Sequence, residues 1–161
     1  MKTQILIEGS DCSGKTTLVE RIKNEFRWDA KALHHRDGEQ FPRYLREYAL
    51  SEQVVFNRGH FSEIVYGKLW RGGNPFSEEQ QSILDAICRQ KMLLIFACPP
   101  LETLQQRYRV RKFPQQIKYD KLVVVEEYFH ELMGKMPHLS YRSTSYDELD
   151  SLLPQIRREV Q

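Results

Sequence analysis

The sequence predicts an α/β fold with three layers, in which helices cover both faces of a central parallel sheet of about five strands. Short apolar segments alternate with amphipathic helical segments along the whole chain, and this alternation is typical of parallel βαβ crossovers. The chain has 161 residues, of which 40% are hydrophobic, so it can bury one sizeable core but not two. We therefore expect one domain over residues 1–161, with ligands at the carboxyl ends of the strands.

The first strand and helix follow directly from the N-terminal residues. Residues 4–8 form a short apolar run that is followed at once by glycine, which predicts a buried strand. Leu18, Ile22 and Phe26 then recur at four-residue spacing, with Val19 beside them. This spacing places them on one face of a helix that packs on the sheet.

The next segments continue the alternation. Residues 30–34 predict a second strand, and Pro42 is expected to open a short helix that carries Leu45 and Ala49. Residues 53–57 predict the third strand.

The middle of the chain carries the clearest helix signal and the clearest strand. Ser77 and Gln80 have the spacing of a capping box, which predicts the start of a helix. The expected buried face of this helix consists of Ile83, Leu84 and Ile87. Residues 92–98 predict a buried fourth strand, and Pro99–Pro100 ends it.

The last third predicts three helices and a short strand. Leu101 and Leu104 begin a helix that leads into a basic stretch at 107–112, and residues 121–133 have a second helical pattern. Residues 141–143 predict a short strand, after which Asp147 is expected to cap the final helix, although Pro154 counts against its regularity. The apolar residues of that helix are Leu149, Leu152, Leu153, Ile156 and Val160.

Charge and cysteine content exclude several classes. The net charge is only +2, so the chain as a whole is not a strongly basic nucleic-acid binder. No N-terminal apolar leader and no apolar run long enough to span a bilayer is present, so we expect a cytoplasmic protein without a membrane partner. Its three cysteines have unrelated spacings, which disfavours a disulfide framework or a zinc site.

Residues 9–16 match the phosphate-loop pattern GxxxxGK[ST] at every fixed position, between a predicted strand and a predicted helix. Glycines let backbone N–H groups surround phosphate oxygens, and the helix start adds the positive end of its dipole. Lys15 is expected to reach the β- and γ-phosphates of ATP, and the Thr16 hydroxyl to bind Mg²⁺. The loop alone leaves kinase, GTPase and ATPase open. No guanine-reading NKxD string is present, however, and the chain is short for a mechanical ATPase.

Residues 8–17 resemble the EGxDxxGK[ST]T signature of thymidylate kinases and, more distantly, the phosphate loop of deoxynucleoside kinases. Residues 57–67 are similar to the DR-x-x-x-S-x-x-x-Y block of that family, residues 98–102 to its strand-to-helix turn, and residues 106–112 to its Arg-rich LID. The resemblance implies a P-loop NTPase fold and a compact, phage-type kinase. Such an enzyme transfers the γ-phosphoryl group of ATP to a deoxynucleotide or nucleoside.

The resemblance also implies site residues. Asp11 would contact the acceptor sugar, Arg58 would hold phosphate, and a LID candidate at 105–118 would bring arginines to the transferred group. The expected catalytic residues are Lys15, Asp11, Arg58, Arg107 and Arg111. The expected nucleotide-binding residues are Gly9, Ser10, Asp11, Cys12, Ser13, Gly14, Lys15, Thr16, Thr17 and Arg107. The expected acceptor-binding residues are Asp11, Arg36, Phe41, Asn57, Arg58, Phe61, Ser62 and Tyr66.

The sequence departs from the family pattern on the acceptor side. Asn57 stands where the family has Asp, and a neutral amide neither acts as a base nor holds Mg²⁺ as a carboxylate does. Glu8, Asp11 and Asp37 are the candidates to take over those roles. Residues 35–38 match only weakly the arginine motif that follows the second strand in the family. The chain is also shorter than a usual thymidylate kinase.

Three functions therefore remain open. The first is a deoxynucleoside monophosphate kinase of thymidylate-kinase type. The second is a kinase for nucleosides or hydroxymethylated pyrimidines, including 5-hydroxymethyluracil within phage DNA. The third is a non-catalytic module that binds ATP. Either a monomer or a homodimer is compatible with each, and a phage-encoded protein would act in the host cytoplasm.

A DNA acceptor would need a local track of basic residues for the phosphate backbone. The candidate track consists of His34, His35, Arg36, Arg43, Arg46, Lys112, Lys118 and Lys121. The same residues are equally compatible with solvated helix faces.

Overall fold

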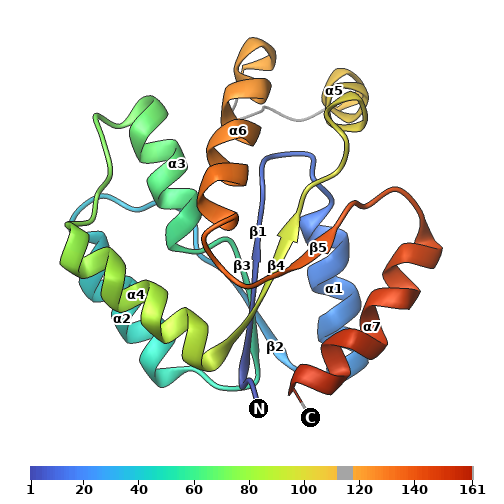
Figure 1. Cartoon of the computed structure of the whole chain (residues 1–161), viewed down its shortest axis with the longest axis horizontal. Helices are drawn as coiled ribbons and strands as arrows, with labels where there is room; N and C mark the ends of the chain where they lie inside the picture. Colours follow the sequence, from blue (N-terminus) through green and yellow to red (C-terminus); the bar gives the residue numbers. More distant parts are fainter. Residues whose placement is uncertain (112–117, 161) are drawn as a thin grey trace.

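The computed structural model describes residues 1–111 and 118–160, and its core is a five-stranded sheet in the order β2-β3-β1-β4-β5. The strands are β1 (Gln4–Glu8), β2 (Asp29–Ala32), β3 (Val54–Asn57), β4 (Met92–Ala97) and β5 (Leu139–Tyr141). All four neighbouring pairs are parallel. Figure 1 shows helices on both faces of this sheet, so the predicted three-layer α/β fold is confirmed.

The helices connect successive strands, as parallel pairing requires. They are α1 (Lys15–Phe26), α2 (Gln40–Leu50), α3 (His60–Trp70), α4 (Glu78–Lys91), α5 (Leu101–Val110), α6 (Leu122–Met133) and α7 (Tyr146–Val160), with a 3₁₀ turn η1 (Tyr119–Lys121) before α6. Helices α1 and α7 lie on one face of the sheet, and α2, α3, α4 and α6 on the other (Figure 1). Helix α5 lies beyond the carboxyl ends of the strands (Figure 1).

Two apolar layers fill the space between sheet and helices. Ile5 and Ile7 of β1 pack in the layer under α1 and α7, whereas Leu6 between them packs in the layer under the other helices. This alternation follows from the two-residue repeat of a strand, whose successive side chains point to opposite faces. Because both faces are covered, the central strands read as continuous apolar runs in the sequence.

The edge strands were the least accurately predicted. β2 runs over Asp29–Ala32 rather than 30–34, and β5 over Leu139–Tyr141 rather than 141–143. All four residues of β2 are exposed, so its sequence carries no apolar pattern that would fix its ends. The expected central strands agree with β1, β3 and β4 to within one residue at each end.

The capping box of α4 is confirmed, but the predicted face is rotated. The Gln80 backbone N–H donates to Ser77 Oγ at 3.2 Å, and the Ser77 backbone N–H donates to Gln80 Oε1 at 3.1 Å. Leu84 is buried as expected, whereas Ile83 is 45% exposed and Cys88 takes its place in the core.

Helix α2 differs from the prediction in its first residue and in its buried side chains. Helix α2 begins at Gln40, before Pro42, and buries Tyr44 and Tyr48 rather than Leu45 and Ala49, because the aromatic rings fill the space above β3.

Ser145, not Asp147, caps α7, since the Glu148 backbone N–H donates to Ser145 Oγ at 3.2 Å. The helix continues through Pro154, which lies on its exposed side.

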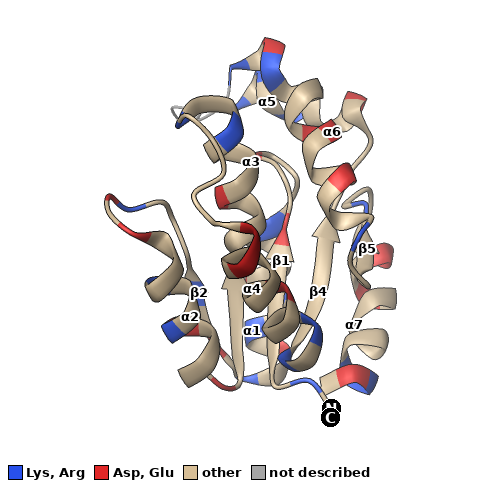
Figure 2. Ribbon diagram, turned by 60° about the vertical axis from the view of Figure 1, so that its left-hand side comes forward, with Lys and Arg blue, Asp and Glu red and all other residues tan. Residues whose placement is uncertain are grey.

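The N-terminus and the end of α7 lie together at the amino end of the sheet, where the Lys2 backbone N–H donates to the Glu159 carbonyl at 2.8 Å (Figure 1). Figure 2 shows charged residues mainly on the helices and loops, while the central strands are almost free of them. Within residues 1–111 and 118–160, no helix has the length and apolar character needed to cross a bilayer.

Candidate active site

The phosphate loop lies where β1 ends and α1 begins. Gly9 and Gly14 both have positive φ, of 144° and 90°, which L side chains rarely adopt. A Cβ on Gly9 would lie 2.4 Å from the Ala97 carbonyl oxygen, so the loop and the end of β4 approach too closely for any other residue. The two fixed glycines of the motif therefore have distinct backbone reasons to be glycine.

Lys15 lies folded back into this loop. Its side chain is nearly buried, and its ammonium group donates to the Ser10 carbonyl and, at 3.2 Å, to Ser13 Oγ. Burial, followed by the nearby charge of Arg58, lowers the pKa of Lys15 from 10.5 to about 7. A triphosphate would offer this cation anionic partners in place of two neutral oxygens.

A cavity of about 800 Å³ opens over the loop. Its walls come from the phosphate loop, from the carboxyl end of β3 at Asn57 and Arg58, and from the segment 143–146 after β5. Thr16 and Thr17 also line it and are exposed. The cavity thus lies at the carboxyl ends of the parallel strands, as expected for this architecture.

Two of the predicted LID arginines meet at the phosphate loop. Arg107 Nη1 donates to the Cys12 carbonyl at 3.2 Å and to Ser143 Oγ at 3.0 Å, and its Nη2 donates to the Ser143 carbonyl. Arg111 Nη1 lies 3.5 Å from Cys12 Sγ. Arg109 diverges, with its Nη2 bonded to Tyr119 Oη at 2.6 Å.

Arg107 and Arg111 therefore converge on one side of the cavity, as their spacing predicted. Residues 112–117 of the LID candidate, Lys112 included, lie outside the described residues. The proposed action of this segment as a LID stays a prediction.

Asp11 and Arg58 form an ion pair that also lines the cavity. Arg58 Nη2 donates to Asp11 Oδ1, and the two side chains are only 11% and 7% exposed. Arg58 has a left-handed backbone with φ 71°, and its guanidinium lies 5.2 Å from the centre of the Tyr66 ring. The turn after β3 thus aims Arg58 back across the sheet edge to the loop after β1.

The other expected acceptor residues do not line this cavity. Phe61, Ser62 and Tyr66 are buried in the first turns of α3, Phe41 is half-buried in α2, and Arg36 is exposed in the loop before it. Their binding of an acceptor stays a prediction. Only Asp11, Asn57 and Arg58 of the expected acceptor set are lining residues.

Glu8, one of the carboxylates considered for the role of the family's aspartate, is fully buried. Its Oε1 accepts from the backbone N–H groups of Gly59 at 2.7 Å and Ser62 at 3.3 Å, and its Oε2 accepts from the Ser62 hydroxyl. Burial raises the pKa of Glu8, and the hydrogen bond from Ser62 opposes that rise. Glu8 therefore fixes the start of α3 and does not face the cavity.

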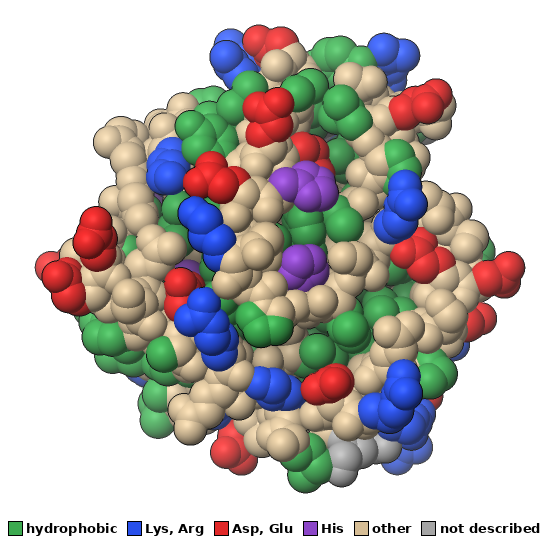
Figure 3. Space-filling view, in the orientation of Figure 1, with side chains coloured by type: hydrophobic (Ala, Val, Ile, Leu, Met, Phe, Trp, Pro, Cys, Tyr) green, Lys and Arg blue, Asp and Glu red, His purple; other side chains and the backbone are tan. Residues whose placement is uncertain are grey.

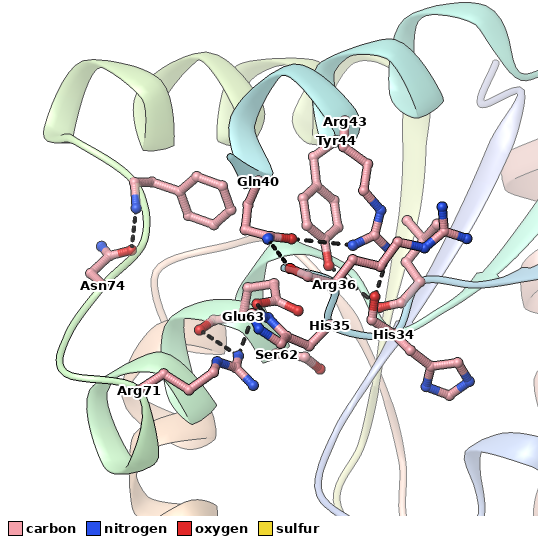
Figure 4. Close-up of polar contacts among 12 residues, drawn as sticks. His34, His35, Arg36, Gln40, Arg43, Tyr44, Ser62, Glu63, Arg71 and Asn74 are labelled. Carbon is pink, nitrogen blue, oxygen red and sulfur yellow. Dashed lines mark hydrogen bonds and ion pairs between the residues drawn. The ribbon is translucent and has the colours of Figure 1, made fainter. Parts of the chain in front are cut away.

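Side-chain contacts hold the loop between β2 and α2 in place, as Figure 4 shows. Gln40 Nε2 donates to the Gly38 carbonyl at 2.8 Å and to the Arg36 carbonyl, and Arg43 Nη2 donates to the His34 carbonyl at 2.6 Å.

The buried Glu63 carboxylate ties the same loop to α3. Its Oε2 accepts from His35 Nδ1 at 2.9 Å and from Arg71 Nη2 at 2.8 Å (Figure 4). His34 alone of this group lines the cavity.

These contacts bear on the suggested DNA track. Arg43 and His35 already make hydrogen bonds to other protein groups, which a phosphate backbone would have to compete with. On the face seen in Figure 3, Lys and Arg side chains are interspersed with Asp and Glu rather than gathered in one basic patch.

Sequence reasoning missed two groups of residues. Segment 143–146 forms a cavity wall, and its place after the last parallel strand was the signal that pointed to it. The second group is a buried network in which His60 Nε2 lies 2.8 Å from Asp85 Oδ1 and His60 Nδ1 lies 3.1 Å from Tyr48 Oη. No sequence signal reveals it, because its members come from three separate helices.

No protein family model matches this chain. A relative is the SPbeta prophage-derived uncharacterized protein YorR of Bacillus subtilis (strain 168), which is 21% identical over 137 residues covering 82% of each chain. The crystal structure of Bacillus subtilis YorR in complex with phosphorylated GDP shares the fold with a TM-score of 0.85 and 20% identity, over 98% of this chain and 97% of that one.

More distant structures share the same architecture. Deoxyadenosine kinase from M. mycoides with bound dCTP has a TM-score of 0.62 and 13% identity, over 96% of this chain and 99% of that one. Shikimate kinase from Acinetobacter baumannii in complex with shikimate has a TM-score of 0.63 and 16% identity, over 99% and 95%. At these identities the likeness shows the P-loop kinase fold, and the narrower resemblance to thymidylate kinases is not confirmed.

Proposed function

We propose that this chain is an ATP-dependent phosphotransferase that moves the γ-phosphoryl group of ATP to a nucleotide or nucleoside acceptor. The observation that carries the proposal is one cavity that holds both the phosphate loop with Lys15 and the Asp11–Arg58 pair. A nucleotide-binding module without transfer would need only the first of these two parts.

The donor side would bind the triphosphate through the backbone N–H groups of residues 9–14 and the start of α1. Lys15 would leave the Ser10 carbonyl and Ser13 Oγ and contact the phosphate oxygens. The exposed hydroxyl of Thr16 has no hydrogen-bond partner in the described part of the chain and lines the cavity, which fits a ligand of Mg²⁺. A bound Mg²⁺ would neutralise charge on the phosphates.

The arginines would act on the charge that develops during transfer. Negative charge spreads over the equatorial oxygens of the transferred group, and guanidinium groups at fixed positions stabilise it. Arg107 and Arg111 approach from α5, and Arg58 approaches from the end of β3. The cavity is therefore lined by cations from two separate parts of the chain.

The similar proteins support a nucleotide as one ligand. YorR was crystallised with phosphorylated GDP, and deoxyadenosine kinase with dCTP. The prophage origin of YorR supports a phage-encoded protein that acts in the host cytoplasm. Two finer assignments compete for the acceptor, a deoxynucleoside monophosphate and a nucleoside or hydroxymethylated pyrimidine.

The test is a transfer assay with γ-labelled ATP and Mg²⁺. Nucleosides, their monophosphates, and duplex DNA with normal or hydroxymethylated pyrimidines are offered as acceptors in separate reactions. Labelled nucleotide or DNA product supports the proposal and identifies the acceptor class. ATP binding without labelled product in any reaction would instead support the binding module.

A further inference from the structure

We call the part of the cavity lined by Asp11, His34, Asn57 and Arg58 its acceptor end. Arg58 pairs there with Asp11, and the Leu33 N–H bond to the Asn57 carbonyl sets His34 beside the end of β3. Asp11 is the only carboxylate among these lining residues, and Arg58 Nη2 occupies its Oδ1. Asn57 is a neutral amide whose buried Oδ1 has no hydrogen-bond partner among the described residues.

The carboxylates outside this set cannot serve as the base. Glu8 has no exposed surface, and both of its oxygens accept hydrogen bonds from the start of α3. Asp37 is exposed in the loop before α2 and is not a lining residue of the cavity. Glu126, the remaining buried carboxylate near the phosphate loop, lines a different depression and not this cavity.

His34 is placed at the cavity by the backbone. The Leu33 N–H donates to the Asn57 carbonyl at 3.1 Å, which extends the pairing of β2 with β3 by one residue and sets His34 beside the end of β3. The Arg43 guanidinium holds the His34 carbonyl at 2.6 Å.

The imidazole of His34 itself is free. It is exposed, lines the cavity and has no hydrogen-bond partner in the described part of the chain. In Figure 4 it points away from the network that holds its own loop.

The nature of the acceptor decides whether such a base is needed. The oxygen of a nucleoside monophosphate is already anionic, so it requires cations for binding and no deprotonation. A hydroxyl group must lose a proton as it attacks, and histidine is well suited to take that proton. At the acceptor end the one arginine is already paired with Asp11, while the imidazole is free.

We propose that the acceptor group is a hydroxyl and that His34 is the general base that deprotonates it, an inference that rests on the phosphotransferase function proposed above. The unprotonated imidazole nitrogen takes the hydroxyl proton while the oxygen attacks the γ-phosphorus of ATP. The bond between that phosphorus and the β–γ bridging oxygen breaks, and its electron pair leaves with ADP. The imidazolium then returns the proton to water.

The test compares His34→Ala with the unaltered protein on paired acceptors. Each deoxynucleoside, and 5-hydroxymethyldeoxyuridine, is offered beside its own 5′-monophosphate, with ATP binding measured by calorimetry in parallel. We expect transfer to a hydroxyl, a loss of kcat by about 10² to 10⁴ in His34→Ala, and an ATP dissociation constant within about twofold of the original. Added imidazole should restore part of the lost kcat, because a free base can enter the vacated space.

His35→Ala is the matched control, since His35 is the next residue of the same loop but is bonded to Glu63. It should keep kcat within about threefold, with no response to imidazole. His34→Gln, with its urea-unfolding midpoint measured, separates loss of the base from loss of folding.

Four results would overturn the proposal. They are transfer only to phosphate groups, a His34→Ala enzyme with more than a third of the original kcat, equal loss and equal rescue in His35→Ala, and no labelled product at all. The first three leave the phosphotransferase function intact, and the last removes both proposals.

Discussion

The two ends of the cavity are built by different means. The donor end is lined by residues 12–17, one continuous stretch that would surround a phosphate group mainly with backbone N–H groups. The acceptor end combines single side chains from the ends of β1 and β3 and from the loop after β2. A site made of backbone constrains mainly the positions whose backbone only glycine adopts easily, here Gly9 and Gly14, whereas recognition by side chains depends on the identity of each contributing residue.

The largest expected effect is on the donor end. Lys15→Ala removes the cation that would contact the β- and γ-phosphates, so transfer should fall by about 10³-fold. Lys23→Ala is the matched control, because Lys23 is an exposed residue of the same helix whose ion pair with Glu20 is long, at 3.7 Å. Near-normal transfer by Lys15→Ala would contradict the assigned role of the phosphate loop.

Arg58→Ala tests the link between the two ends. It leaves the Asp11 carboxylate largely buried without its partner, and we expect a loss of about 3 kcal/mol in the free energy of unfolding. We also expect kcat/KM to fall by about 10²-fold. Urea unfolding and steady-state kinetics measure the two effects.

The Arg58→Ala/Asp11→Asn double variant is the control for stability, because it also removes the stranded charge. It should regain part of the lost stability but none of the activity. Recovery of activity in the double variant would show that Arg58 acts only by neutralising Asp11.

The pH dependence of ATP binding tests the donor end without a transfer step. In the free protein the pKa of Lys15 is about 7, so above that pH the amine is neutral and must take up a proton to contact phosphate. Between pH 7.5 and 9.5 the ATP affinity should fall by up to about tenfold per pH unit. Calorimetry in buffers of different ionisation enthalpy should show uptake of nearly one proton.

The lowered pKa of Lys15 makes the free energy of unfolding rise with pH, whereas it makes the ATP affinity fall. Between pH 7 and 10.5 the unfolded chain holds a proton on Lys15 that the folded chain lacks, so this group makes the free energy of unfolding rise with pH. Lys15→Arg stays charged throughout and should flatten both dependences. An ATP affinity independent of pH in the original protein would contradict the buried, neutral amine.

The smallest effect is expected at the loop that carries His34. Gln40→Ala removes the bonds to the Arg36 and Gly38 carbonyls, and we expect about 1 kcal/mol less stability and an acceptor KM raised about threefold. The ATP dissociation constant should not change, because the hydrogen bonds of Gln40 go to Arg36, Gly38 and Arg43 and not to the phosphate loop. A change in ATP binding of similar size would show that the two ends are coupled through α2.

The residues of the donor end could be predicted from the sequence, whereas those of the acceptor end could be predicted only in part. The pattern at residues 9–16 fixes a backbone shape, and the positive φ values of Gly9 and Gly14 agree with it. Ser62, by contrast, matches a family block but donates its hydroxyl to the buried Glu8. Whether a side chain reaches a cavity or a core partner depends on neighbours that are distant in sequence.

The sequence by itself determined the order of strands and helices, the central strands, and the phosphate loop with its lysine. These follow from local properties: apolar runs, apolar residues at four-residue spacing, a capping box, and glycines at positions that require a positive φ. The tertiary structure alone decided that Arg58 pairs with Asp11, that Glu8 is sealed away and that His34 faces the cavity. Parallel pairing of β1, β2 and β3 joins their carboxyl ends at one edge, and only that pairing brings together side chains that lie up to 47 residues apart in the chain.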